Sequence, residues 1–194
     1  MKYLSFDIEA TGLEEHDKII EFAMVPFDTE MGINHELEFH TFVHCPSFEE
    51  LKPQLNQWVI DNNKGLIEKA HTQGIKIPEF KEKLEQYFES EAVKNYFGNE
   101  KIVLFGKSIN AIDLPFLNRD LGWDWMRKYF HHRVNDLSSS TLALIDLGFL
   151  PKGSDSGSQM MAYLGMGEVA HTALEDAVNT AIIYLKILDK LKTN

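Results

Sequence analysis

The sequence has little cysteine, little positive charge and no long apolar run, and each shortage narrows what the protein can be. Cys45 is the only cysteine in 194 residues, which excludes an intramolecular disulfide and suits a reducing compartment. Eighteen apolar residues never occur in a row, and Asp7 and Glu9 interrupt the first apolar stretch, so neither a membrane span nor a secretory leader is expected. We therefore expect a cytoplasmic protein without a membrane partner.

Basic residues are outnumbered by acidic ones, 19 against 30, which gives a formal net charge of -11. This charge argues against a protein that coats long nucleic acid, because such binding depends on many lysine and arginine contacts to phosphates. A short or end-on nucleic-acid substrate remains compatible, since metal ions held by carboxylates would cancel part of the charge locally. The composition, 44% apolar and 25% charged, is that of a globular protein, and we expect residues 1–194 to form one domain.

A pair of acids stands out in the first apolar run. Asp7 and Glu9 lie two residues apart in a predicted strand over residues 2–9, so both side chains point to one face. The opposite face carries Leu4, Phe6 and Ile8. Neighbouring carboxylates are hard oxygen ligands that suit magnesium or manganese, although such a pair can also be the solvated face of an edge strand. Thr11 and Gly12 end the strand with a turn.

Hydrophobic periodicity predicts an alternation of strands and helices after that turn. The predicted strands are 2–9, 18–27, 37–43, 101–105 and 134–137, and the predicted helical segments are 53–60, 78–96, 113–121, 138–147, 159–164 and one from Thr172 to the C-terminus. A connection over residues 28–34, containing Gly32, predicts that the first three strands are antiparallel. The pattern therefore indicates an α/β fold.

Three further residues lie at predicted helix starts. Pro115 is tolerated only in a first helical turn, which places the start near Asp113. Thr172 and Glu175 form a capping-box pattern, so His171 precedes the last helix and Asp176 lies about one turn inside it. Taken singly, each aspartate has an ordinary interpretation as a helix cap or first-turn charge, and the histidine as a surface residue.

Together and in this order, these residues resemble the DEDDh group of 3′-to-5′ exonucleases, the DnaQ-like superfamily that includes the polymerase III proofreading subunit, ribonuclease T and oligoribonuclease. The matching motifs are Phe6-Asp7-Ile8-Glu9-Ala10-Thr11-Gly12-Leu13, Asp113-Leu114-Pro115-Phe116-Leu117 and His171-Thr172-Ala173-Leu174-Glu175-Asp176-Ala177. The resemblance spans nearly the whole chain. It implies a ribonuclease H-like fold, a mixed sheet with helices on both sides.

The resemblance also implies residue roles in phosphodiester hydrolysis with two divalent cations, Mg²⁺ or Mn²⁺, as cofactors. Asp7 would bridge both ions, Glu9 and Asp176 would hold the ion of the nucleophile, and Asp113 would help to hold the other through water. His171 would be the general base, because its reference pKa near 6.5 lets it accept a proton from the attacking water.

The substrate implied by the resemblance is a short or single-stranded RNA or DNA with a free 3′ end, from which 5′-mononucleotides are released. Main-chain groups of Ala10, Thr11 and Gly12 would meet the terminal nucleotide, and Leu13 would pack against its base. The competing interpretation is a non-catalytic nucleic-acid-binding or polymerase-accessory module. All five catalytic positions are present, which argues against that module, since binding alone needs no general base.

The middle motif departs from the usual pattern, because Ser108-Ile109 stands where a His-Asn pair is common, and Asn110 is displaced by one position. Gly106-Lys107-Ser108 is more similar to oligoribonuclease, as is Phe130-His131-His132-Arg133 followed by Asp136-Leu137-Ser138. Ala10, however, stands where oligoribonucleases usually have methionine.

Two other groups of residues carry weaker signals. His44 and Cys45 could form half of a zinc site, but no second cluster completes it, and a structural role is favoured. Trp123 and Trp125 begin the most basic aromatic stretch, which continues through Arg127, Lys128, His131, His132 and Arg133. This stretch could stack bases and hold phosphates, or form a homodimer contact, and we weigh the two equally.

Overall fold

The computed structural model describes residues 1–167 and 172–193. Its strands are β1 (Lys2–Ala10), β2 (Ile19–Asp28), β3 (Gly32–Ile33), β4 (Phe39–Phe42), β5 (Ile102–Gly106) and β6 (Phe130–Asp136). Its helices are α1 (Phe48–Leu51), α2 (Gln57–Asn62), α3 (Lys64–Gln73), α4 (Ile77–Glu89), α5 (Glu91–Phe97), α6 (Asp113–Leu121), α7 (Trp123–Tyr129), α8 (Leu137–Asp146), α9 (Gly157–Tyr163) and α10 (Ala173–Thr193). Within these residues, no helix combines the length and apolar character needed to cross a membrane.

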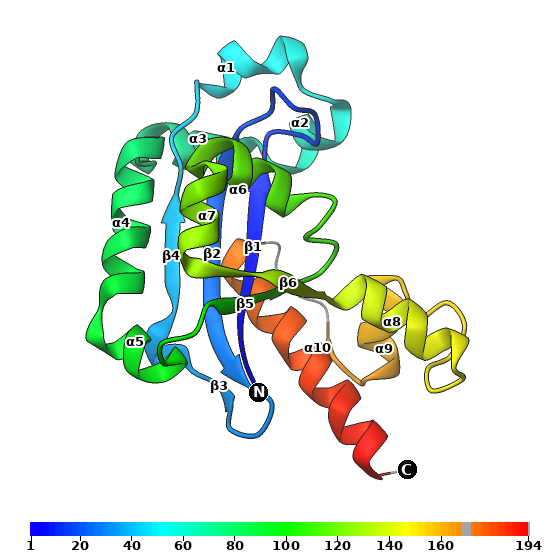
Figure 1. The fold of residues 1–194 in the computed structure, drawn as a ribbon. Helices are drawn as coiled ribbons and strands as arrows, with labels where there is room; N and C mark the ends of the chain where they lie inside the picture. The colour runs from blue at the N-terminus through cyan, green and yellow to red at the C-terminus, as the bar shows by residue number, and fades with distance from the viewer. Residues whose placement is uncertain (168–171, 194) are drawn as a thin grey trace.

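The strands form one mixed sheet with β1 near its centre (Figure 1). The order is β3-β2-β1-β5-β6, and β4 also pairs with β2. β2 runs antiparallel to β1 and β4, whereas β5 runs parallel to β1 and β6 runs parallel to β5. The predicted antiparallel start followed by helix and strand alternation is confirmed.

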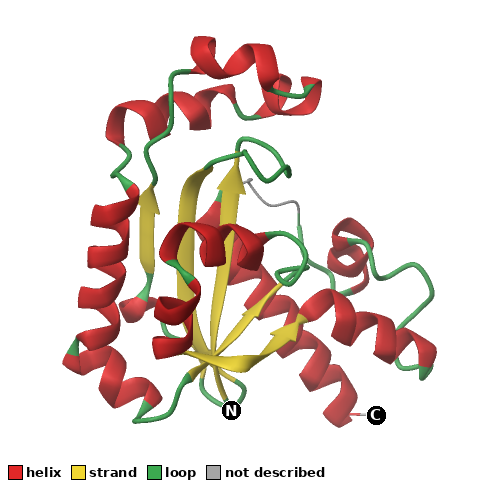
Figure 2. Ribbon diagram, turned by 45° about the horizontal axis from the view of Figure 1, so that its top comes forward, coloured by secondary structure: helices red, strands yellow, loops and turns green. Residues whose placement is uncertain are grey.

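The two faces of β1 enter different hydrophobic clusters, as its alternating sequence predicts. Leu4, Phe6 and Ile8 pack in a cluster with residues of α4, α6 and α7. On the opposite face Tyr3 joins a cluster with α8, α9 and α10, and the Ser5 hydroxyl donates to the Ala177 carbonyl of α10 over 2.7 Å. Helices therefore cover both faces of the sheet (Figure 2), which is the ribonuclease H-like α/β architecture expected from the resemblance.

Cys45 lies in a third, smaller hydrophobic cluster, in which α1, α2 and α3 pack together next to the N-terminal end of β2. Burial raises the pKa of its thiol to about 11. The thiolate that zinc would require is therefore disfavoured, and the structural role favoured from the sequence fits this environment.

Some element boundaries differ from the sequence prediction. The helix expected over residues 78–96 is interrupted at Ser90, which adopts an extended conformation and caps α5 by accepting a hydrogen bond from the Val93 N–H. The strand expected over residues 134–137 begins four residues earlier, at Phe130, and ends where Asp136 caps α8. The predicted helices also omit α1, α3 and α7, whose short apolar faces pack on neighbouring elements without a long periodic pattern.

Phe80 of α4 packs against the sheet. It is fully buried, and its ring centroid lies 5.1 Å from that of Phe22 on β2. We expect Phe80→Ala to lower the free energy of unfolding by about 3–5 kcal/mol, because it leaves a cavity in the main core. Urea denaturation followed by circular dichroism measures this loss. Met31→Ala is the matched control, since Met31 is 89% exposed and should change stability by less than about 0.5 kcal/mol.

Candidate active site

The candidate site begins at the C-terminal end of β1, where Asp7 and Glu9 lie on the face that meets α10. Glu9 is the direct cross-strand partner of Glu21 on β2, and the register shifts by one residue immediately after this pair, where Ala10 pairs with Ile19. Such a bulge bends the strand end and re-aims its side chains. The bend ends the regular pairing of β1 next to the two carboxylates.

Asp176 is brought to these two carboxylates by the first turn of α10. Thr172 caps this helix, because its hydroxyl accepts the Glu175 N–H over 3.3 Å and donates to the Glu175 carboxylate over 2.8 Å. Asp7, Glu9 and Asp176 then each offer one carboxylate oxygen, and these oxygens all lie within 4.8 Å of one another. Residues from the two ends of the chain thus form a compact group of oxygen ligands.

Asp113 adds a buried carboxylate at the first residue of α6. Its Oδ1 accepts the backbone N–H of Ile8 over 3.1 Å, which ties the start of α6 to the strand between Asp7 and Glu9. Burial raises the pKa of Asp113 to about 7, although the Ile8 hydrogen bond opposes this rise. The structure therefore places all four predicted carboxylates around one end of β1.

Burial and mutual repulsion make these carboxylates hard to ionise. Desolvation, followed by the charges of Asp113, Asp176 and Glu9, holds the pKa of Asp7 well above its usual range. Desolvation, followed by the charges of Asp176 and Glu21, raises the pKa of Glu9 to about 7. A group of acids with this electrostatic character is stabilised in its charged form by bound cations.

Glu21 is a further acidic residue at this site that the motifs do not include. Its side chain is buried, accepts the Ala173 N–H at the start of α10 over 3.3 Å, and lies 2.5 Å from Nε2 of His40 on β4. Glu9 itself has a hydrogen-bond partner in Asn63, which lies between α2 and α3. The sequence signal for Glu21 is a charge inside the apolar run of β2, whose only other charged residue is Asp28 at its end.

The turn that follows β1 is held by Asp17. Its carboxylate accepts the Thr11 hydroxyl over 2.7 Å and the Glu14 N–H over 2.8 Å, while the Thr11 N–H donates to the Lys18 carbonyl. A Cβ at Gly12 would come within 2.3 Å of the Asp17 carboxylate, so this turn requires glycine. Thr11 therefore has its N–H and hydroxyl engaged inside the turn, whereas Leu13 is 71% exposed.

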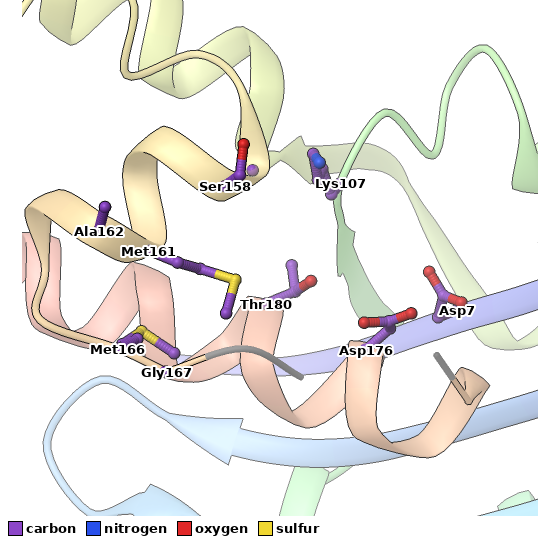
Figure 3. Close-up of a pocket in the computed structure, with 10 residues that line it drawn as sticks. Asp7, Lys107, Ser158, Met161, Ala162, Met166, Gly167, Asp176 and Thr180 are labelled. Carbon is purple, nitrogen blue, oxygen red and sulfur yellow. The ribbon is translucent and has the colours of Figure 1, made fainter. Parts of the chain in front are cut away.

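A cavity of about 820 Å³ opens beside the carboxylates (Figure 3). Asp7 and Asp176 lie toward one end of it, and Met161 and Met166 lie toward the other. Lys107 and Ser158 line it between α9 and the end of β5. The volume is that of pockets that hold drug-sized ligands, about 300–1,000 Å³, so the carboxylates face a space large enough for a nucleotide.

The sequence also matches a family model. The model described as "Exonuclease" (RNase_T) matches residues 4–184. The chain belongs to this exonuclease family, as its resemblance to DEDDh, DnaQ-like enzymes predicts. The family consists of hydrolytic nucleases that generally use divalent metal ions. No curated protein is significantly similar to the chain in sequence.

Solved structures with the same fold include several exonucleases. Cell-death related nuclease 4 (CRN-4) matches 97% of this chain with a TM-score of 0.68 and 18% identity, and the match covers 64% of that protein's chain. The nuclease domain of 3′hExo, a DEDDh family member bound to rAMP, matches 99% of this chain and 92% of its own with a TM-score of 0.64 and 18% identity. E. coli exonuclease I with a 5cy-dT13 oligonucleotide matches 99% of this chain and 43% of its own, with a TM-score of 0.64 and 16% identity.

One predicted site residue, His171, lies outside the described residues. The role inferred for it from the family motif therefore stays a prediction. The structure does locate its neighbours in the motif, since Thr172 and Asp176 belong to the cap and first turn of α10.

The raised pKa values predict how the stability of the metal-free protein depends on pH. An acid whose pKa is higher in the folded state binds its proton more tightly there, so the free energy of unfolding falls as pH rises through the window between the two pKa values. For Glu9 this window runs from 4.5 to about 7. Asp7 and Asp113 change in the same direction. We expect the melting temperature in chelator to fall by several degrees between pH 5 and pH 7.5, since 1 kcal/mol shifts it by about 2–4 °C.

Asp176→Asn tests the electrostatic origin of this dependence. Asp176 is the largest charge contribution to the raised pKa of Glu9, so its neutralisation should reduce the fall in melting temperature. Calorimetry on both proteins measures the difference, and an equal pH dependence in both would contradict the repulsion described here.

Proposed function

We propose that this protein is a metal-dependent 3′-to-5′ exonuclease that hydrolyses short or single-stranded RNA or DNA to 5′-mononucleotides. The observation that carries the proposal is the grouping of Asp7, Glu9 and Asp176, whose ligand oxygens lie within 4.8 Å of one another. Membership of the exonuclease family supports the reaction type. The match over residues 4–184 supports the proposal that residues 1–194 form one exonuclease domain. The single cysteine of the chain, which is buried, favours a cytoplasmic location.

The carboxylates fit divalent cations by their chemistry. Asp113 is buried, whereas Asp7, Glu9 and Asp176 are half-buried and crowded together. Their charge has a high cost without a cation, and magnesium and manganese prefer such oxygen ligands. We assign two ions to the site: Asp7 would contact both, Glu9 and Asp176 would hold one, and Asp113 would help to hold the other. When bound, these cations supply an activated water and neutralise charge on the attacking and leaving oxygens.

The chain's own residues fix and operate this arrangement. The Ile8 N–H orients the Asp113 carboxylate, and Glu21 holds the first N–H of α10, three residues before Asp176. His171 would take the proton of the attacking water, because a neutral imidazole is a general base at neutral pH.

The terminal nucleotide is assigned to the turn after β1. A second cavity, of about 350 Å³, is lined by Leu13 and by α6 residues that include Phe116. The exposed Leu13 side chain is available to pack against a base, while main-chain groups of Ala10 and Gly12 would contact the nucleotide. Thr11 is assigned to the same contact, although its N–H and hydroxyl already form hydrogen bonds within the turn. The 3′hExo nuclease domain bound to rAMP supports a nucleotide in a site of this fold.

Asp7→Asn tests the catalytic metal site. We expect a manganese-dependent time course on 5′-labelled RNA and DNA of two to twenty nucleotides to show stepwise shortening by the wild-type protein and none in chelator. The variant should lose activity by about 10²–10³-fold, which is the scale of losing one electrostatic contact in a transition state. Calorimetry should show weaker manganese binding.

The same time course defines the substrate. Preference for dinucleotides and trinucleotides would indicate an oligoribonuclease-type activity, whereas equal rates at all lengths would indicate a general trimming enzyme. Undiminished digestion by Asp7→Asn would reject the two-metal assignment.

His171→Ala separates the enzyme from a non-catalytic module of the same fold. Loss of a general base should reduce turnover by about 10²–10⁴-fold, while manganese affinity stays near that of the wild type. A binding module would have no turnover to lose and would bind nucleic acid equally well before and after the change. Wild-type turnover that survives in the variant would reject His171 as the base.

A further inference from the structure

We propose that a third cavity, bounded by α6, α7 and β6, binds an unpaired base of the single strand upstream of the cleaved end. This cavity has a volume of about 390 Å³, enough for one nucleobase with part of its sugar. The inference rests on the proposed function, since it concerns the path of the same substrate. From the sequence alone, base stacking and a dimer contact were equally favoured for the stretch from Trp123 to Arg133. The inference assigns this stretch to base stacking.

The two tryptophans of this stretch have different parts. Trp125 is 7% exposed, packs against Phe88 and donates its indole N–H to Glu85 over 2.7 Å, so it belongs to the core. Trp123 is 60% exposed and lines the cavity, with the Arg127 guanidinium 5.6 Å from its ring centroid. An exposed indole with an adjacent guanidinium offers a stacking surface and a cation to a nucleotide.

The charge around this cavity distinguishes it from the other two. Among the described residues that line it, none is acidic, and Arg127, His131 and His132 are present. The cavity beside the carboxylates contains Asp7 and Asp176 together with Lys107, and the cavity beside Leu13 contains Glu14 and Glu15 together with Arg119. In a protein of net charge -11, a polyanion is therefore favoured at the cavity between α6 and β6.

Not every basic residue of the stretch takes part. Lys128 is committed elsewhere, because its ammonium lies 3.3 Å from the Glu89 carboxylate and 2.7 Å from the Tyr129 hydroxyl. Desolvation and the nearby positive groups His132 and Arg133 lower the pKa of His131. The cationic contact is thus carried by Arg127, with the stacked His131 and His132 rings beside it.

The position of the cavity links it to the candidate active site. Asn110 and Leu114 line it, and they flank Asp113 in the sequence. Pro115 lines both this cavity and the one beside Leu13. The Asn110 and Asn118 amides supply donors and acceptors at the cavity wall for the edge of a base. The cavity therefore adjoins α6, the helix whose first residue is Asp113.

A homodimer through the same surface is disfavoured by its charge. A two-fold symmetric contact places the same patch on both subunits, so Arg127 and Arg133 of one copy would face the same cationic patch on the other. Like charges across an interface oppose association, whereas phosphates complement them.

The test compares two exposed tryptophans. Trp123→Ala should weaken binding of a twelve-nucleotide single strand by about 10-fold, which is the scale of one lost base-aromatic stack. The ratio of the affinity for this strand to the affinity for a dinucleotide should therefore change. Trp58→Ala is the matched control, because Trp58 is 63% exposed on α2 and lines none of the three cavities. Fluorescence anisotropy in the Asp7→Asn background measures binding without consuming the strand.

Arg127→Gln gives a second, independent measurement. Loss of one phosphate contact should reduce the slope of log affinity against log salt concentration by about 0.7 for a single strand. Equal affinities and slopes in Trp123→Ala, Arg127→Gln and Trp58→Ala would overturn the inference while leaving hydrolysis by the wild type intact. A wild-type protein that fails to hydrolyse any strand would instead reject the proposed function. Sedimentation that shows a dimer disrupted by Trp123→Ala, with strand affinity unchanged, would assign the surface to a second copy of the chain.

Discussion

The packing of α10 against β1 holds carboxylates together more closely than their charges favour, and the candidate site depends on this packing. The apolar side chains of α10 are buried against the sheet, and the Ser5 hydroxyl fixes the helix at the Ala177 carbonyl. The free energy of that burial opposes the repulsion among Asp7, Glu9 and Asp176. Bound cations would remove the repulsion, so the fold and the metal site stabilise each other.

Glu21 shows how the same region distributes its negative charge. A fifth carboxylate beside Glu9 adds to the repulsion, yet Glu21 is buried with two partners of its own, the Ala173 N–H and His40. Glu21 holds the N-terminal end of α10, where Asp176 lies. Its hydrogen bonds therefore keep Asp176 near Asp7 and Glu9, although the repulsion among these acids would push them apart. Glu21 thus positions the first turn of α10, on which Asp176 lies.

Much of this arrangement could be predicted from the sequence, because it depends on local rules. Alternation along β1 places Asp7 and Glu9 opposite Leu4, Phe6 and Ile8, and the Thr172 capping pattern fixes where α10 begins. The grouping of Asp113 with these residues required the family motif, since no local rule brings the start of α6 to Ile8.

What the sequence could not provide depends on contacts between distant residues. The bulge after Glu9, the engagement of Thr11 by Asp17 and the separate environments of Trp123 and Trp125 arise from tertiary packing. Two tryptophans two residues apart look equivalent in sequence. On α7 they lie about 200° apart around the helix axis, so one enters the core and the other faces solvent.

The distribution of charge connects the active site with the inferred base-binding cavity. A net charge of -11 repels a polyanion at long range, so a substrate strand must gain its affinity from local features. Divalent cations among the carboxylates would attract the phosphate that is cleaved, and the cavity at Trp123 offers stacking, which salt screens less than ion pairs. Such a division of binding favours single strands, because only unpaired bases expose their faces to an indole. With the proposed activity, such a division would let an acidic protein act on strand ends without coating the strand.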